Sequence, residues 1–237
     1  MDLKILSFNI HKGFNNVRLK PTLDLLRNQI ASEHFDIVGL QEIHGEHRDH
    51  GNQLEKLADR VWPEFAYGKN AVTTKGHHGN GLLSRFPIKK WENLNISGHK
   101  IDQRGVLHAV LDCESRNLHV LVTHLGLFQV WREKQLKSVC QRIENHIPEN
   151  EPIILCGDFN DWNEFATDFL YDTLGLNEVF ESERGRHART FPNWLPFLCL
   201  DRIYVRGLKF FSPQTLSSRK WRNLSDHLPI SVRVSWP

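Results

Sequence analysis

The sequence contains 237 residues, of which 40% are hydrophobic and 24% are charged, and its formal net charge is +2. These values are ordinary for a globular protein, and they predict a single domain over residues 1–237. The net charge is too small to indicate a nucleic-acid partner by itself, and the basic residues form no block of five or more.

The cysteines and the apolar runs exclude other classes of protein. Cys113, Cys140, Cys156 and Cys199 lie in or beside apolar segments without Cys-x-x-Cys spacing, so they indicate neither a disulfide framework nor a zinc site. No apolar stretch approaches membrane-spanning length, and no leader-like segment precedes the first strand. We therefore expect a cytoplasmic protein, and we expect it to be a monomer.

In chain order, short apolar runs predict buried strands that end or begin at polar residues. The polar residues at these positions are Asn9 after residues 3–8, Gln41 and Glu42 after 36–40, Thr123 and His124 after 118–122, Asp158 and Asn160 after 152–156, Asp201 within 200–205, and Asp226 and His227 before 228–234. Such strand ends would converge on one rim of a sheet.

Two helices and a hairpin are predicted between these strands. Apolar residues recur at helical spacing over about residues 19–32 and again over about 132–147. Residues 106–112 and 117–123 read as an antiparallel hairpin that turns across residues 114–116.

The most informative segment is the run from Pro152 to Asn160, where an apolar strand stops at Gly157, Asp158, Phe159 and Asn160. Charged groups are rarely buried without a partner, so an acid at the mouth of a buried strand indicates chemistry. Asp158 and Asn160 are two residues apart, which places them on one face of an extended backbone. A single such position is more often a turn or a cap. Five or six together favour a functional site.

These segments resemble the ordered motifs of the endonuclease/exonuclease/phosphatase superfamily over about residues 3–234. The motifs that carry the resemblance are Phe8-Asn9-Ile10, Gln41-Glu42-Ile43, Gly79–Arg85, Thr123-His124-Leu125, Gly157-Asp158-Phe159-Asn160, Leu200-Asp201-Arg202-Ile203 and Ser225–Pro229. The resemblance implies an α/β fold, a four-layer α/β/β/α sandwich of the DNase I-like type with mixed, mostly antiparallel sheets. It also implies a hydrolase that acts on phosphoric esters.

The residue types at these positions indicate a metal-assisted hydrolase. Asn9, Glu42 and Asp226 supply oxygen donors, which suit Mg²⁺ or Mn²⁺ better than Zn²⁺. A metal would neutralise a phosphodiester and its leaving group.

The resemblance gives the remaining residues catalytic roles. His227 can accept a proton from water near neutral pH, and Asp201 pairs with it and fixes its tautomer. Asp158 would orient or deprotonate the attacking water, and the sequence does not choose between Asp158 and His227 as the base. Asn160 and His124 would donate hydrogen bonds to phosphoryl oxygens. Arg104 resembles a basic residue beside the phosphate, although a solvated turn arginine is an equally good interpretation.

Four other features favour a structural interpretation. We expect Asn80 to be a turn residue of the Gly-Asn-Gly segment with positive φ. We expect His44, His47 and His50 to lie in a solvated loop rather than to bind a metal, and His77 and His78 to lie in a polar surface loop. The apolar residues 194–198 could rest on a membrane, but a buried corner is the favoured interpretation.

Three functions remain open. The first is a phosphodiesterase or nuclease acting on nucleic acid, with a basic track formed by Arg18, Lys20, Arg104, Arg186, Arg189, Lys220 and Arg222. The second is a phospholipid phosphodiesterase or an inositol-phosphate phosphatase with peripheral contact to lipid. The third, a catalytically dead binding module, is disfavoured by the full set of polar residues. Abasic endonucleases of the superfamily carry Asn-x-Asn at the first motif, whereas here His11 follows Asn9-Ile10; the first motif resembles that of a bacterial branch whose members are mostly unassigned.

Overall fold

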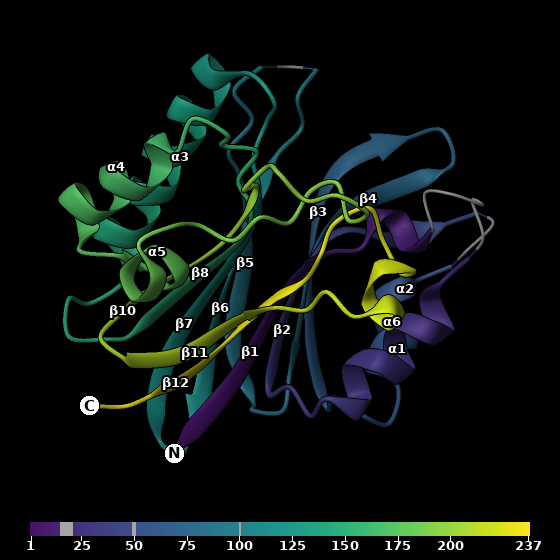
Figure 1. Cartoon of the computed structure of the whole chain (residues 1–237), viewed down its shortest axis with the longest axis horizontal. Coiled ribbons are helices and arrows are strands. Elements are labelled where there is room, and N and C mark those ends of the chain that lie inside the picture. Colours follow the sequence, from purple (N-terminus) through teal and green to yellow (C-terminus); the bar gives the residue numbers. More distant parts are fainter. Residues whose placement is uncertain (15–20, 49–50, 100) are drawn as a thin grey trace.

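Two β-sheets face one another at the centre of the molecule, and helices cover their outer faces (Figure 1). The computed structural model describes residues 1–14, 21–48, 51–99 and 101–237. Within these residues each sheet has six strands. The fold is therefore the α/β sandwich with mixed, mostly antiparallel sheets that the sequence predicts.

The first sheet contains both ends of the sequence. Its strand order is β11 (Lys209–Thr215), β12 (Ile230–Ser235), β1 (Asp2–Asn9), β2 (Ile37–His47), β4 (Gly76–Ser84) and β3 (Glu64–Thr73). Only β1 and β2 run parallel in the described sheet, and α1 (Leu23–Ser32) connects them. Two parallel strands need such a crossover, because the chain must return to the opposite edge of the sheet before the second strand can begin.

The second sheet repeats this arrangement. Its order is β5 (Ile88–Asn95), β6 (Gly105–Cys113), β7 (Arg116–His124), β8 (Ile153–Asp158), β10 (Asp201–Arg206) and β9 (Asn177–Glu178). Its parallel pair is β7 and β8, which α3 (Gln129–His146) connects. The predicted hairpin is present as β6 and β7, and Glu114 and Ser115 turn between them with positive φ.

Three apolar clusters hold the layers together. Ile5, Val120 and Ile154 belong to the cluster between the two sheets, where a Cβ on Gly39 would lie 2.7 Å from Sγ of Cys156 on the facing sheet. Leu136 and Leu170 belong to the cluster beneath α3 and α4 (Phe165–Leu174) on the second sheet. The third cluster packs α1 and α2 (Gln53–Ala58) on the first sheet. Each sheet thus buries both faces, which fits the near-continuous apolar runs of its strands.

The sequence placed some boundaries incorrectly. The first helix begins at Leu23 rather than near residue 19, and residues 19 and 20 lie outside the described part of the chain. Strand β2 runs on to His47, because a bulge after Leu40 allows pairing with β4 to resume at Ile43. The expected loops at His44 and His47 and at residues 76–79 are therefore strand; His50 is not among the described residues.

The shorter elements complete the connections. These are η1 (His11–Gly13), α5 (Val179–Arg184) and α6 (Arg219–Arg222). Among the described residues, no helix combines the length and the apolar character needed to cross a membrane.

Candidate active site

The ends of the two parallel strand pairs meet at one rim of the sandwich. Asn9 ends β1 and Asp158 ends β8, and Nδ2 of Asn9 donates a 3.0 Å hydrogen bond to Oδ2 of Asp158. Strand β7 ends at the same level, because its last residue His124 pairs in register with Asp158. Asn9 pairs with Gln41, next to the bulge after which β2 continues to His47. The rim therefore joins polar side chains from both sheets.

A buried histidine lies between two carboxylates at this rim. Nδ1 of His227 is 2.8 Å from Oδ2 of Asp201, and its Nε2 is 3.8 Å from Oδ2 of Asp158. Strand register brings the two acids together, since Asp201 is the ladder partner of Asp158. Burial alone would lower the pKa of His227, but Asp201 and Asp158 outweigh it and raise this pKa to about 10. The ring is thus an imidazolium at neutral pH.

Asp158 is the most connected carboxylate of the rim. Its Oδ2 accepts from Asn9, and its Oδ1 accepts from the backbone N–H of Asn160 at 3.0 Å. Burial raises the pKa of Asp158 to about 6, although His227 opposes the increase. A carboxylate with this pKa is ionised at neutral pH and accepts a proton more readily than an ordinary aspartate.

His124 and Asn160 flank the same carboxylate. Nε2 of His124 is 3.4 Å from Oδ2 of Asp158, and burial followed by the charge of Arg104 holds the pKa of His124 well below its usual value. Asn160 has a φ of +48° and donates from Nδ2 to the carbonyl of Leu125 at 2.9 Å. That bond uses one of the two amide hydrogens, which leaves the second for a ligand.

Arg104 is fixed rather than loose in a turn. Its Nε donates to Oδ1 of Asp102 at 2.8 Å, and Asp102 is held in turn by Nε2 of Gln135 at 2.8 Å. Nη1 of Arg104 lies 3.5 Å from the carbonyl oxygen of His124. The guanidinium therefore stands beside the rim, and a solvated turn arginine is the wrong interpretation.

The three predicted metal ligands come from the end of β1, the bulge of β2 and the segment before β12. Glu42 adopts a φ of +56° at the bulge of β2, and its carboxylate is 3.7 Å from Nζ of Lys12. Asn9 accepts at Oδ1 from the backbone N–H of His11 at 3.1 Å, and its carbonyl oxygen accepts from Oγ of Ser225 at 2.7 Å. The latter bond holds the segment that carries Asp226 against the end of β1.

The donor set fits a hard cation. It consists of two partly exposed carboxylates, from Glu42 and Asp226, and the amide of Asn9, with no thiolate or imidazole donor among them. Among the described residues, no group of three or more histidine, cysteine or acidic side chains is arranged so that these side chains alone could hold a metal ion. His44 and His47 instead stack with ring centroids 4.3 Å apart.

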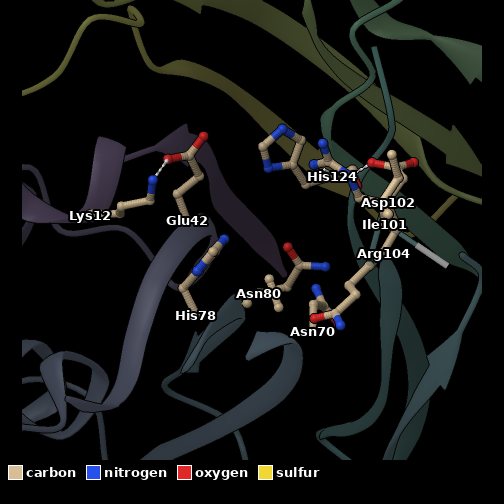
Figure 2. Close-up of a pocket in the computed structure, with 12 residues that line it drawn as sticks. Lys12, Glu42, Asn70, His78, Asn80, Ile101, Asp102, Arg104 and His124 are labelled. Carbon is tan, nitrogen blue, oxygen red and sulfur yellow. Dashed lines mark hydrogen bonds and ion pairs between the residues drawn. The ribbon is translucent and has the colours of Figure 1, made fainter. Parts of the chain in front are cut away.

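A polar cavity of about 300 Å³ opens beside these residues. Figure 2 shows the side chains of Lys12, Glu42, His78, Asn80 and Arg104 around this shared space, with His124 at its edge. Asn70, Ile101 and Asp102 also line it. Both sheets thus contribute walls to the cavity.

Asn80 is not a turn residue, contrary to the expectation from its flanking glycines. It lies within β4, is fully buried, and donates from Nδ2 to the carbonyls of Gly105 at 2.9 Å and Val122 at 3.1 Å. These bonds cross from the first sheet to the second. The glycines are needed for close approach, since a Cβ on Gly79 would lie 1.8 Å from the carbonyl oxygen of Gly68.

Sequence reasoning missed Lys12 and His78 as residues of the site. His78 was assigned to a surface loop because glycines flank residues 77 and 78. The strand alternation contained a usable signal, since His78 is two residues from Asn80 and therefore on the same face. Lys12 gave no such signal, because its direction depends on the single turn of η1, where its φ is +57°.

Comparisons with known proteins agree with this geometry. A model of the Endonuclease/Exonuclease/phosphatase family matches residues 6–227. The uncharacterized protein YbhP of Escherichia coli (strain K12) is 42% identical over 242 residues, which cover 98% of this chain and 95% of YbhP.

Two solved structures share the fold. An endonuclease/exonuclease/phosphatase from Beutenbergia cavernae superposes with a TM-score of 0.81 at 18% identity, covering 99% of this chain and 72% of that one. A mannosyl-6-phosphatase from Bacteroides thetaiotaomicron superposes with a TM-score of 0.79 at 20% identity, covering 99% and 100%.

Proposed function

The chain belongs to the endonuclease/exonuclease/phosphatase family, and from this membership we propose that it is a divalent-metal-dependent phosphodiesterase. Members of the family are in general phosphoric ester hydrolases. The observation that carries the proposal is the buried carboxylate of Asp158, which Asn9, His124 and His227 surround, together with the adjoining cavity that His124, Lys12 and Arg104 line. This arrangement combines a base, charged donors and hard oxygen ligands in one place.

Asn9, Glu42 and Asp226 would hold the cation, Mg²⁺ or Mn²⁺. When bound, it neutralises a non-bridging oxygen and stabilises the leaving group. Glu42 can offer its second carboxylate oxygen to the cation, since only Oε2 is paired with Lys12, at 3.7 Å.

Asp158 is the better candidate for the base, because His227 lies between two carboxylates and keeps its own proton. In this proposal Oδ2 of Asp158 accepts the proton of the attacking water. His227 remains an imidazolium and donates from Nε2 to the charge that develops on the phosphoryl group. Asp201 positions the ring by accepting from Nδ1 at 2.8 Å.

The remaining polar groups bind and orient the substrate. His124 is uncharged at neutral pH and would donate a hydrogen bond to a phosphoryl oxygen, as would the second amide hydrogen of Asn160. Arg104 adds a fixed positive charge beside the cavity. These groups favour in-line attack because they hold the phosphate in one orientation.

For the substrate, we propose nucleic acid first. The support is that Arg186, Arg189 and Arg222 of the expected basic track line one cavity, while Arg18 and Lys20 lie outside the described residues. Contacts to successive phosphates along a polynucleotide would use such a cluster.

One observation favours a phospholipid as the second candidate. The sequence favours a buried corner at residues 194–198, but that interpretation is wrong: Trp194, Leu195 and Phe197 are exposed. Exposed large apolar side chains near an active site fit a substrate that is presented in a membrane.

A panel assay tests the proposal. Supercoiled plasmid, single-stranded DNA, RNA, sphingomyelin, cardiolipin and inositol phosphates would each be offered with Mg²⁺, Mn²⁺ or EDTA. We expect turnover of at least one phosphodiester with metal and none with EDTA, and none by the Asp158→Asn variant. A KM for DNA that rises with salt supports nucleic acid, because counterions are released on binding. Absence of turnover on every substrate would overturn the proposal.

A further inference from the structure

The loop of residues 192–197 carries three large apolar side chains into solvent. Trp194 is 72% exposed, and Leu195 and Phe197 are each 60% exposed. The base of the loop is closed, since Leu198 N donates to the carbonyl of Phe191 at 2.9 Å and Phe191 N donates back at 3.2 Å. Single exposed apolar residues are common, but three within four residues of one loop form a patch that indicates a partner.

This apolar loop is fixed to the segment that carries the catalytic candidates. Asn193 N donates to the carbonyl of Asp226 at 2.7 Å, and Nδ2 of Asn193 donates to the carbonyls of Arg222 and Ser225. The ring of Phe191, at the base of the loop, is 4.9 Å from the ring of His227. Whatever binds the loop therefore lies close to the proposed site of hydrolysis.

An arginine-lined cavity of about 330 Å³ adjoins the apolar loop, because Pro196 forms part of its wall. Its cationic lining residues are Arg184, Arg186, Arg189 and Arg222, and no acidic residue is among the described residues that line it. Nε of Arg222 is held by the carbonyl of Ser217 at 2.8 Å, and Arg184 by that of Pro213, so neither charge is neutralised. In the described part of the chain, Arg186 and Arg189 form no ion pair.

We infer that the apolar loop and the arginine-lined cavity together form a docking surface for membranes that contain anionic phospholipid. Tryptophan, leucine and phenylalanine side chains enter the boundary between headgroups and acyl chains, and adjacent arginines bind the anionic headgroups. Binding in this way would hold the candidate site against the lipid surface. This consequence, unlike the binding itself, rests on the proposed function.

The side-chain types favour a membrane over the other partners. The arginines would bind the phosphates of a polynucleotide as well as anionic headgroups, so the apolar loop is what distinguishes the two partners. Single-stranded nucleic acid binds through aromatic rings that stack on bases, and Leu195 cannot stack in this way. Leu127 and Phe128, which follow His124 at the end of β7, are also exposed, so apolar side chains flank the candidate site from two loops. A second copy of the chain bound at this surface would bring two uncompensated arginine clusters together.

Vesicle co-sedimentation in EDTA tests the inference without requiring turnover. The wild-type protein is expected to bind vesicles of phosphatidylcholine mixed with phosphatidylglycerol, and to bind pure phosphatidylcholine vesicles at least about tenfold more weakly. Arg186→Glu combined with Arg189→Glu should lower binding to the anionic vesicles about tenfold or more. Trp194→Ser combined with Phe197→Ser should lower it to a similar extent, since the inserted apolar area is lost.

Matched control variants show whether the effect is specific to this surface. Trp91→Ser removes an exposed tryptophan on β5, and Lys137→Glu reverses an exposed charge on α3; both should bind vesicles as the wild type does. Thermal unfolding of every variant confirms that it is folded.

Wild-type protein that does not bind anionic vesicles would overturn the inference, and so would loop variants that bind them as the wild type does. Loop variants that lose affinity for a single-stranded oligonucleotide, when vesicles are not bound, would assign the surface to nucleic acid instead. Vesicle binding together with absence of turnover on every substrate of the panel in Mg²⁺ would contradict the proposed function alone.

Discussion

His227 and Asp201 form the shortest contact between a ring nitrogen and a carboxylate at the rim, with Nδ1 2.8 Å from Oδ2. Burial disfavours the charged ring, yet the adjacent carboxylates raise the pKa of His227 to about 10. In the proposed mechanism the histidine is therefore protonated before the reaction begins, and it acts as a charged donor rather than as the acceptor that the sequence also allows.

We expect Asp201→Asn to lower kcat by at least about 10²-fold on the best substrate, the scale of losing a positioned donor. The same change should lower the pKa of His227, because the imidazolium loses its nearest counter-charge, and an NMR titration of the ring would measure this. His227→Ala and Asp158→Asn should each reduce kcat to a similar extent. The control is Asp168→Asn, which alters an exposed acid on α4. Near-normal turnover in all three rim variants would show that the residues are wrongly assigned.

The proposed metal ligands predict a response to Mg²⁺ in the absence of substrate. Wild-type protein should unfold at a higher temperature in Mg²⁺ than in EDTA, because a ligand that binds only the native state stabilises it. Glu42→Gln should reduce this increase, since a neutral amide is a weaker ligand for a hard cation.

The matched control for this experiment is Glu46→Gln, which changes an exposed glutamate four residues after Glu42 in β2. It should respond to Mg²⁺ as the wild type does. Equal responses of the Glu42 and Glu46 variants would argue against a metal at Glu42, and full activity after exhaustive chelation would argue against metal dependence itself.

Asn80 should matter for stability as well as for the cavity. Asn80→Ala removes both hydrogen bonds that cross from β4 to the second sheet, and it leaves buried carbonyl groups of Gly105 and Val122 without this donor. We expect a loss of about 2 kcal/mol in the free energy of unfolding, measured by urea denaturation. Asn163→Ala, at an exposed asparagine after β8, should cost much less. An equal cost at the two positions would show that the inter-sheet bonds contribute little.

The buried side chain of His108 should make the stability of the fold sensitive to acid. Burial, together with the neighbouring His119, lowers the pKa of His108 to about 3. Nε of Arg142 donates to its Nδ1 at 3.0 Å, so its Nε2 donates to Nδ1 of His119 at 2.9 Å. A folded-state pKa below the unfolded value means that the unfolded chain binds more protons, so stability falls as pH falls from about 6.5 towards 3.

Because of this histidine, we expect the free energy of unfolding to fall by roughly 2 kcal/mol between about pH 7 and pH 5. His108→Gln should be less stable at neutral pH but should lose less stability on acidification. Urea denaturation at several pH values would measure the difference, with His34→Asn, at an exposed histidine of positive φ, as the control. If the His108 variant and the wild type have the same pH dependence, the buried histidine does not set the acid limit.

Much of the rim could be predicted because strand ends are encoded locally. Asp158, His124 and Asn9 each follow an apolar run, and in each sheet a helical pattern connects two such runs, which indicates parallel strands that end at the same edge. Position within one strand was therefore sufficient to place these side chains at the same edge.

Lys12, His78 and the Trp194–Phe197 loop could not be placed in this way, because their environment is set by distant segments. His78 belongs to the site only because β4 continues past Asn80 to pair with the bulged half of β2. The apolar loop is exposed because Asn193 and Phe191 attach it at its base to residues 222–227, which leaves its tip in solvent. Apolar composition favours burial, and only the tertiary anchor shows that these side chains are not buried.

The hydrogen bond from Oγ of Ser225 to the carbonyl of Asn9 joins residues 216 positions apart in the sequence. During synthesis, the end of β1 cannot contact β12 or the segment that carries Ser225 and Asp226 until these residues have been made. A nascent chain that stalls before this point can hold several paired strands, but it has neither Asp226 nor His227. Such non-local contacts form late in folding. If Asp226 and His227 act as proposed, hydrolytic capacity arises only after the segment that carries them has been synthesised.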